Sequence, residues 1–162
     1  MAIQVGDSIP NVTVFVMGED GGPQAISTDE LFKGKKVALF GVPGAFTPTC
    51  SASHLPGYVK NADALRDKGA DDIICLAVND AFVMTAWGVD QNVGDKVRMV
   101  SDGTATFAKA TGLELDLSEP GLGMRCQRFS MIVDDGVVKD IETEDPPTVD
   151  LTSAEKMLEK MS

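Results

Sequence analysis

The sequence predicts an α/β fold with a mixed central sheet flanked by helices, and three observations indicate it. Apolar segments typical of buried strands alternate with helical patterns from about residue 36 onward. The dipeptide Asp135-Gly136, a strong tight-turn signal, separates two further strand-like segments. Near the C-terminus, leucine, methionine and alanine recur at the spacing of one helix face. The alternation favours parallel strand pairing in the first part, and the turn favours an antiparallel hairpin after it.

The individual elements follow from local patterns of apolar residues, turn residues and helix caps. The expected strands cover residues 36–42, 73–78, 96–100, 127–133 and 137–141. The expected helices cover residues 48–69, with an interruption at Pro56-Gly57, and then 81–91, 106–110 and 152–161. Thr152 or Ser153 is suited to cap the last helix. The segment between residues 111 and 124 is expected to be a loop.

The order of these elements predicts a thioredoxin-like fold. A parallel βαβ half, followed by a ββα half and with a cysteine at the first helix, is the arrangement of that fold. The chain has 162 residues, 43% of them hydrophobic, which is enough for one core and short for two. We therefore predict a single thioredoxin-like domain over residues 1–162. Pro146-Pro147 is expected to be a stiff connector within it rather than a domain linker.

The charge balance argues against several classes of partner. The chain carries 25 acidic and 14 basic residues, which gives a formal net charge of −11. This charge repels phosphate backbones and anionic membrane surfaces, so neither nucleic acid nor a membrane is expected as a partner. The sequence begins without the pattern of a signal peptide, and its apolar runs are too short to span a bilayer. We expect a soluble cytoplasmic protein.

The cysteine pattern points to reduced thiols rather than to disulfides or a metal. The chain has three cysteines: Cys50, Cys75 and Cys126. Because an odd number of cysteines cannot all pair within one chain, a disulfide framework is not expected. The chain has no Cys-x-x-Cys pair, and His54 is its sole histidine, so few ligands exist for a structural zinc ion. We expect no metal and no cofactor.

Cys50 has the most informative surroundings of the three. It follows a buried strand and a Pro/Gly turn, with Thr47 suited to cap a helix and Pro48 suited to its first position. A sulfur in a first helical turn lies near free backbone N–H groups and the positive end of the helix dipole, and both favour thiolate over thiol. The alternative is an inert cysteine packed under the helix.

Longer motifs around Cys50 give a specific resemblance. The run from Pro43 to Ser51, followed by the run from His54 to Tyr58, resembles the peroxidatic signature of type II (atypical) peroxiredoxins of the plant and bacterial branch. Further segments agree in order and spacing: Val78–Met84 with Trp87, Gly112–Asp116, Gly121–Arg125 and Arg128–Met131. The resemblance implies a cofactor-free thiol peroxidase that reduces hydrogen peroxide and organic hydroperoxides and serves antioxidant defence and cell redox homeostasis.

The resemblance also implies roles for individual residues. Cys50 becomes a sulfenic acid on reaction with peroxide, and Thr47 orients the peroxide through its hydroxyl. Pro43 shields the site, while Arg128 stabilises the thiolate and polarises the peroxide. A surface ion pair is the alternative for Arg128, and helix packing or solvent exposure is the alternative to a catalytic role for His54.

How the cysteine is reduced again is less determined by the sequence. Some relatives use a resolving cysteine at the position of Cys75, but this residue lies in an apolar run and is equally suited to a buried strand. We favour external reduction by glutathione with glutaredoxin, or by thioredoxin. Cys126 has no usual counterpart in the family, so its role is open. The apolar residues Phe82, Val83, Met84 and Trp87 are candidates for a pocket or a dimer face, with ordinary core packing as the alternative. Such residues lie near a dimer interface in the family, so a homodimer is expected by analogy.

Competing classes of function have weaker support. A thiol-disulfide oxidoreductase normally needs Cys-x-x-Cys, and Thr47 stands where its first cysteine would be. A cysteine hydrolase needs a separate histidine base, whereas the sole histidine is expected in the same helix as Cys50. A redox sensor or holdase shares the first oxidation step, and turnover with a reductant distinguishes it from an enzyme.

Overall fold

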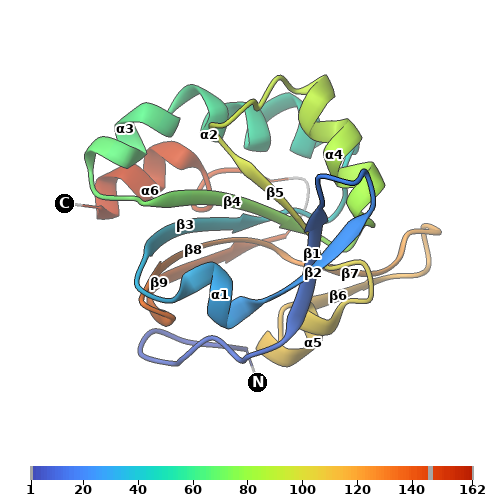
Figure 1. Cartoon of the computed structure of the whole chain (residues 1–162), viewed down its shortest axis with the longest axis horizontal. Helices are drawn as coiled ribbons and strands as arrows, with labels where there is room; N and C mark the ends of the chain where they lie inside the picture. The colour runs from blue at the N-terminus through green and yellow to red at the C-terminus, as the bar shows by residue number, and fades with distance from the viewer. Residues whose placement is uncertain (1, 146–147, 162) are drawn as a thin grey trace.

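A seven-stranded mixed sheet runs through the middle of the molecule (Figure 1), in a computed structural model that describes residues 2–145 and 148–161. From one edge to the other, its strands are β2 (Pro23–Ser27), β1 (Thr13–Met17), β5 (Arg98–Ser101), β4 (Asp72–Ala77), β3 (Lys36–Gly41), β8 (Arg128–Asp134) and β9 (Val137–Glu144). Strands β3, β4 and β5 are parallel, and the other neighbours pair antiparallel. The predicted mixed sheet is confirmed.

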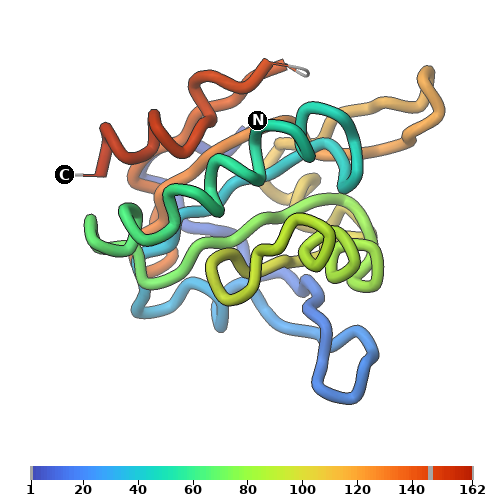
Figure 2. The backbone as a smooth tube through the Cα atoms, turned by 90° about the horizontal axis from the view of Figure 1, so that it is seen from above, coloured from blue at the N-terminus to red at the C-terminus, as the bar shows by residue number. Residues whose placement is uncertain are grey.

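Helices cover both faces of this sheet. One face carries α2 (Leu55–Lys60), α3 (Ala62–Asp67), α4 (Ala81–Asp90) and α6 (Ala154–Lys160), and the other carries α1 (Thr28–Phe32) and α5 (Thr106–Thr111) (Figure 1). Viewed from above, α6 lies alongside the helices that follow the cysteine loop (Figure 2). Among the described residues, no helix combines the length and apolar character needed to cross a membrane.

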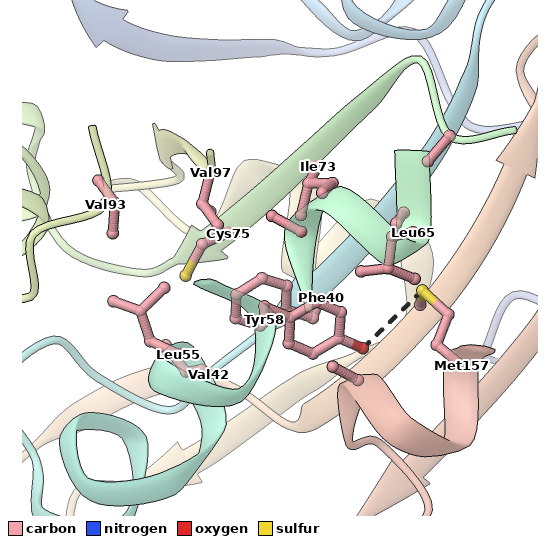
Figure 3. Close-up of a cluster of buried hydrophobic side chains, with 14 of the residues drawn as sticks. Phe40, Val42, Leu55, Tyr58, Leu65, Ile73, Cys75, Val93, Val97 and Met157 are labelled. Carbon is pink, nitrogen blue, oxygen red and sulfur yellow. Dashed lines mark hydrogen bonds between the residues drawn. The ribbon is translucent and has the colours of Figure 1, made fainter. Parts of the chain in front are cut away.

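The strand side chains divide between two apolar cores, as the pleat of a sheet requires. Along β3, Ala38 and Phe40 enter the core under α2 and α6, while Val37 and Leu39 enter the opposite core. In the first core the ring of Phe40 stacks on Tyr58, with ring centroids 3.9 Å apart (Figure 3). β3 is therefore buried on both faces, which explains its continuous apolar run.

The predicted C-terminal hairpin is also confirmed. β8 and β9 pair antiparallel across a turn in which Asp135 and Gly136 both have positive φ, 50° and 79°. Positive φ at both central residues is the requirement of a type I′ turn, and an Asp-Gly pair meets it at low cost. The last helix begins with Ser153, whose hydroxyl accepts from the Lys156 backbone N–H at 3.2 Å.

Some elements differ from expectation. The segment 111–124 was expected to be a loop, but it contributes to a small separate hairpin of β6 (Glu114–Leu117) and β7 (Gly123–Cys126). The edge strand β2, its neighbour β1 and the helix α1 precede the first predicted element. β2 and β6 are short, largely half-exposed and lack a continuous apolar run. β1 does have one, at residues 14–17, so its signal was present in the sequence. The expected connector Pro146-Pro147 lies outside the described residues.

The predicted interruption at Pro56-Gly57 is wrong. α2 passes through both residues, and the irregularity lies just before it, in a π-helical turn at Cys50–His54 where the Leu55 N–H bonds the Cys50 carbonyl. Pro56 sits in the first turn of α2, where its missing N–H costs little. The wide turn therefore falls on Cys50 itself, and π-turns of this kind are frequent at functional sites.

Gly41 lets β8 approach the cysteine strand closely, and its replacement tests this contact. Gly41 pairs with Phe129, and a Cβ on Gly41 would overlap the Phe129 ring. We expect Gly41→Ala to lower the free energy of unfolding by about 1–3 kcal/mol, measured by urea denaturation, because the overpacked ring must shift. Gly22→Ala, whose Cβ meets only ordinary contacts, is the control and should change it by less than about 0.5 kcal/mol. Equal stabilities of the two variants would contradict this account.

Candidate active site

Cys50 lies where three elements meet on one face of the sheet. The chain leaves β3 at Gly41, crosses the loop that holds Pro43 and Thr47, and enters the helical turn at Cys50. Because β8 pairs antiparallel with β3, its first residue, Arg128, lies beside the end from which this loop departs. The sheet thereby brings two residues together that are 78 positions apart in the sequence.

A buried guanidinium faces the sulfur of Cys50. The Arg128 Nη2 donates to the Cys50 Sγ at 3.1 Å, and the Nη1 donates to the His54 Nδ1 at 2.7 Å. All three residues are at most 1% exposed. The alternative of a surface ion pair for Arg128 is therefore wrong, and so is solvent exposure for His54.

The buried guanidinium of Arg128 has no carboxylate partner among the described residues. A buried cation is costly unless an anion or a set of acceptors compensates it. Within the described residues, Arg128 forms no ion pair with a carboxylate, and its Nε is the one fully buried side-chain nitrogen or oxygen without a hydrogen-bond partner. The Cys50 sulfur is the group that the guanidinium meets in place of a carboxylate.

His54 is a neutral acceptor in this arrangement. Burial, and next the positive charge of Arg128, lower the pKa of His54 to about 3. An arginine can only donate, so the Nδ1 of His54 must accept and its Nε2 carries the proton, which it donates to the Thr152 carbonyl at 3.0 Å. The imidazole therefore links the C-terminal segment to Arg128 without adding charge.

The loop before Cys50 is held by polar contacts from several elements. The Thr47 hydroxyl donates to the Gly44 carbonyl at 2.7 Å, so it does not act as the helix cap that the sequence suggested. This bond leaves the Thr47 oxygen free to accept a further hydrogen bond. The Pro43 carbonyl accepts from Arg125 at 3.3 Å, and the Asn79 side chain accepts from the Ala45 N–H at 2.9 Å.

Two of these supporting residues were missed in the sequence. Asn79 follows β4 as the cysteine loop follows β3, and the carboxyl ends of adjacent parallel strands meet at one edge of a sheet. The position of Asn79 just after a predicted parallel strand was therefore a signal present in the sequence. Arg125 offered no such signal, because an arginine beside a glycine-rich loop is usually exposed; here its Nε also donates to the Leu122 carbonyl at 2.8 Å.

The other two cysteines lie in environments that favour the neutral thiol. Cys75 pairs with Phe40 across β3 and β4 and is fully buried in the same core (Figure 3), and burial raises the pKa of its thiol well above the ordinary value. Cys126 is also fully buried, and its thiol donates to the Val42 carbonyl at 3.1 Å. Burial, and next the charge of Asp102, raise the pKa of Cys126 to about 12. The sequence left the role of Cys126 open, and the structure favours a packed, protonated thiol.

The side chains gathered around Cys50 are suited to covalent chemistry at sulfur. Among residues 2–145 and 148–161, no group of three histidine, cysteine or acidic side chains is placed to hold a metal ion. What the structure brings together is a sulfur nucleophile, cationic N–H donors and a hydroxyl oxygen that can accept. Such a set can hold a small polar molecule against the sulfur and stabilise negative charge on its departing atom.

Comparisons with known proteins agree with this chemistry. The family model described as Redoxin matches residues 4–158. The chain is 44% identical to Peroxiredoxin-2D of Arabidopsis thaliana over 159 residues, covering 98% of each chain, and 45% identical to the chloroplastic Peroxiredoxin-2E of that plant, covering 99% of this chain and 70% of the relative. Its structure resembles that of reduced Prx3 from Vibrio vulnificus in complex with hydrogen peroxide, with a TM-score of 0.94, 46% identity and 99% of each chain covered.

The buried neutral histidine predicts a pH dependence of stability. The folded pKa of His54, about 3, lies below the ordinary value of 6.5, so the unfolded chain binds the proton more readily between these values. This contribution is complete above the unfolded pKa and is lost as the pH falls. We expect it to cost about 2 kcal/mol at about pH 5 relative to neutral pH, by denaturant unfolding.

His54→Gln is the matched variant, because an amide can replace both hydrogen bonds and does not titrate. Its stability should fall less over the same pH range. Since His54 is the sole histidine, its NMR signal also reports the titration without ambiguity. A folded-state midpoint near the ordinary value would contradict the neutral assignment.

Proposed function

The chain belongs to the redoxin family and is a peroxiredoxin, a thiol-dependent peroxidase, and from this premise we propose that Cys50 is the sulfur that peroxide oxidises. The contact between the Arg128 Nη2 and the Cys50 Sγ, 3.1 Å long, is the observation that carries this assignment. Among residues 2–145 and 148–161, no guanidinium hydrogen-bonds to the thiol of Cys75 or Cys126, and burial raises the pKa of both thiols.

The proposed reaction begins with attack by the Cys50 thiolate on one peroxide oxygen. A sulfur electron pair forms the S–O bond while the O–O bond breaks, which gives a sulfenic acid and an oxygen anion that takes a proton to leave as water or an alcohol. Sulfur is oxidised and the peroxide is reduced. Both hydrogen peroxide and organic hydroperoxides fit this scheme, because only the O–O–H group reacts.

The neighbouring residues have separate roles in the proposal. The guanidinium of Arg128 stabilises the thiolate and then the negative charge on the departing oxygen, and its unpartnered Nε–H is a donor still available for an oxygen atom. The Thr47 oxygen, whose proton is engaged by Gly44, accepts from the peroxide O–H and orients it. Pro43 is buried beside this loop and shields the sulfur from water.

We propose that an external thiol completes the cycle. Glutathione attacks the Cys50 sulfenic acid, giving a mixed disulfide and water; a second thiol from glutathione, glutaredoxin or thioredoxin then releases the Cys50 thiol. Cys75 is fully buried in strand β4 and its pKa is raised, so it is poorly suited to attack as a thiolate. An internal Cys50–Cys75 disulfide remains the alternative that the experiment below distinguishes.

A homodimer is the proposed assembly. Phe46 and Phe82 are 53% and 56% exposed, unusually high values for phenylalanine. The Phe46 ring contacts Trp87 of α4, with centroids 6.5 Å apart, and Phe82 lies in the first turn of the same helix. A second copy of the chain on this surface would bury both rings and exclude water from the mouth of the cysteine loop.

A cytoplasmic location and a role in antioxidant defence complete the proposal. Three unpaired thiols are typical of a reducing compartment. Since one similar relative is chloroplastic, cell fractionation is the direct test; recovery with a sealed organelle would contradict the cytoplasmic assignment.

The peroxidase assignment predicts distinct behaviour for three proteins in single-turnover peroxide consumption. The wild type and Cys75→Ser should consume peroxide rapidly, whereas Cys50→Ser should lose at least about a thousandfold in rate, because it lacks the nucleophile. Intact mass after addition of one equivalent of peroxide should show one added oxygen on Cys75→Ser and on the wild type. Loss of two hydrogens in the wild type alone would instead show that Cys75 resolves Cys50. Rapid consumption by Cys50→Ser would overturn the assignment.

The dimer proposal predicts a specific effect of charge on α4. Phe82→Glu should shift the protein from dimer to monomer in sedimentation equilibrium, because the carboxylate would be buried in the interface. Val5→Glu is the matched control: Val5 is 60% exposed, but its segment bonds β9 rather than α4. A monomeric wild type, or equal effects of both variants, would rule out this interface.

A further inference from the structure

The carboxylate of Glu144 gathers an unusual number of donors from the segment before α6. It accepts from the backbone N–H groups of Asp150, Leu151 and Thr152 at 2.8–2.9 Å, and from the Thr152 hydroxyl at 2.5 Å. Burial opposes its ionisation, but these hydrogen bonds prevail and lower the pKa of Glu144. The last residue of β9 is thus an anionic anchor for the chain that leads to the final helix.

What this anchor fixes is the backbone carbonyl of Thr152. Thr152 is fully buried, and its carbonyl accepts from the His54 Nε2 and from the Tyr58 hydroxyl, each at 3.0 Å. The bond to Nε2 keeps the proton on that nitrogen, which leaves Nδ1 as an acceptor for Arg128. The contacts therefore form a continuous chain from Glu144 through Thr152, His54 and Arg128 to the sulfur.

The sheet places Glu144 beside Arg128, the residue of this chain of contacts that reaches the sulfur. Glu144 pairs with Arg128 across β8 and β9, so their side chains share one face of the sheet. They form no ion pair within 4 Å, and the Glu144 carboxylate is engaged by the C-terminal segment instead. Glu144 therefore acts on Arg128 indirectly, through the histidine that the Thr152 carbonyl holds.

We infer that Glu144 is a positioning residue for the peroxidase reaction. Its carboxylate orders Asp150–Thr152, so that the Thr152 carbonyl holds His54 in the neutral form with Nδ1 as an acceptor. The Nδ1 of His54 in turn directs the guanidinium of Arg128 at Cys50. This inference rests on the proposed function of Cys50 and extends it to a part of the chain outside the cysteine motif. Arginine has a long, flexible side chain, so His54 restricts the guanidinium to the direction in which the Nη2 meets the sulfur. Misplacement of a reacting group by about 1 Å can cost about a hundredfold in rate.

The first test compares two carboxylates of the same strand. Glu144→Ala should lower the second-order rate constant for peroxide by about 10-fold to 100-fold and move the appearance of the Cys50 thiolate, followed by its ultraviolet absorbance, to higher pH. Glu142→Gln is the control, because Glu142 also lies on β9 but pairs with Lys160 at 2.8 Å. It should change neither quantity. A fall in thermal stability alone, with the rate and the thiolate signal unchanged in Glu144→Ala, would overturn the inference.

Milder variants keep the test decisive if Glu144→Ala folds poorly. Glu144→Gln retains an acceptor and should recover most of the rate, while Thr152→Val removes only the hydroxyl donor and should lose part of it. His54→Leu should reproduce the effect of Glu144→Ala on rate and thiolate, and His54→Gln, which can replace both hydrogen bonds, should restore them. Failure of His54→Leu to affect either quantity would show that the contacts serve stability only.

A double-mutant cycle separates action through Arg128 from a general effect on folding. In an Arg128→Gln background, Glu144→Ala should alter the rate and the thiolate signal by less than about twofold, because the group that it positions is already absent. Equal effects in both backgrounds would contradict the inference. A wild-type protein that consumes no peroxide through Cys50 would instead refute the proposed function, so the two failures are distinguishable.

Discussion

The contact between a buried guanidinium and a buried sulfur is the constraint around which the rest of the structure is organised. Taking Arg128 out of water is costly, and no carboxylate among the described residues pairs with it. The fold meets this cost by bringing Cys50 and His54 to the two ends of the same guanidinium. That arrangement requires β8 to pair beside β3. It also requires glycine at position 41, because a Cβ there would overlap the ring of Phe129 and displace the first residues of β8. The contact between Arg128 and Cys50 therefore depends on the close packing of β3 against β8.

The three cysteines show how environment rather than residue type decides reactivity. All are fully buried, and burial alone favours the neutral thiol. Cys75 and Cys126 experience that effect without a guanidinium donor, and the pKa of each is raised. Of the three cysteines in the described part of the chain, only Cys50 has an arginine N–H directed at its sulfur. The packing of the sheet thus separates one candidate nucleophile from two thiols of equal intrinsic chemistry, which limits oxidation of the core.

Local patterns predicted the central fold well but only half of the candidate site. The strands β3, β4 and β8 have long apolar runs, and the Asp135-Gly136 turn has its own chemistry, so each could be read from a short window. β6 and β7 could not, because their four-residue strands expose much of their surface and carry no apolar run. In the same way, the residues around Cys50 could be proposed from the motif, whereas Arg128 came only from a family resemblance. The contribution of Glu144 passes through the Thr152 backbone carbonyl, which every residue type possesses and no sequence pattern marks.

The neutral state of His54 explains why an imidazole suits the position behind Arg128. A carboxylate there would form an ion pair with the guanidinium and draw its positive charge away from the sulfur, since a fixed anion and the thiolate would share one cation. A protonated imidazole would have no lone pair for the Nη1 and would repel the guanidinium. Burial and the nearby cation exclude the protonated state by lowering the pKa of His54 to about 3. The neutral ring accepts a hydrogen bond at 2.7 Å and so orients Arg128, while the whole cationic charge remains beside the sulfur. In the proposed reaction that charge is then available to the oxygen that departs from the peroxide.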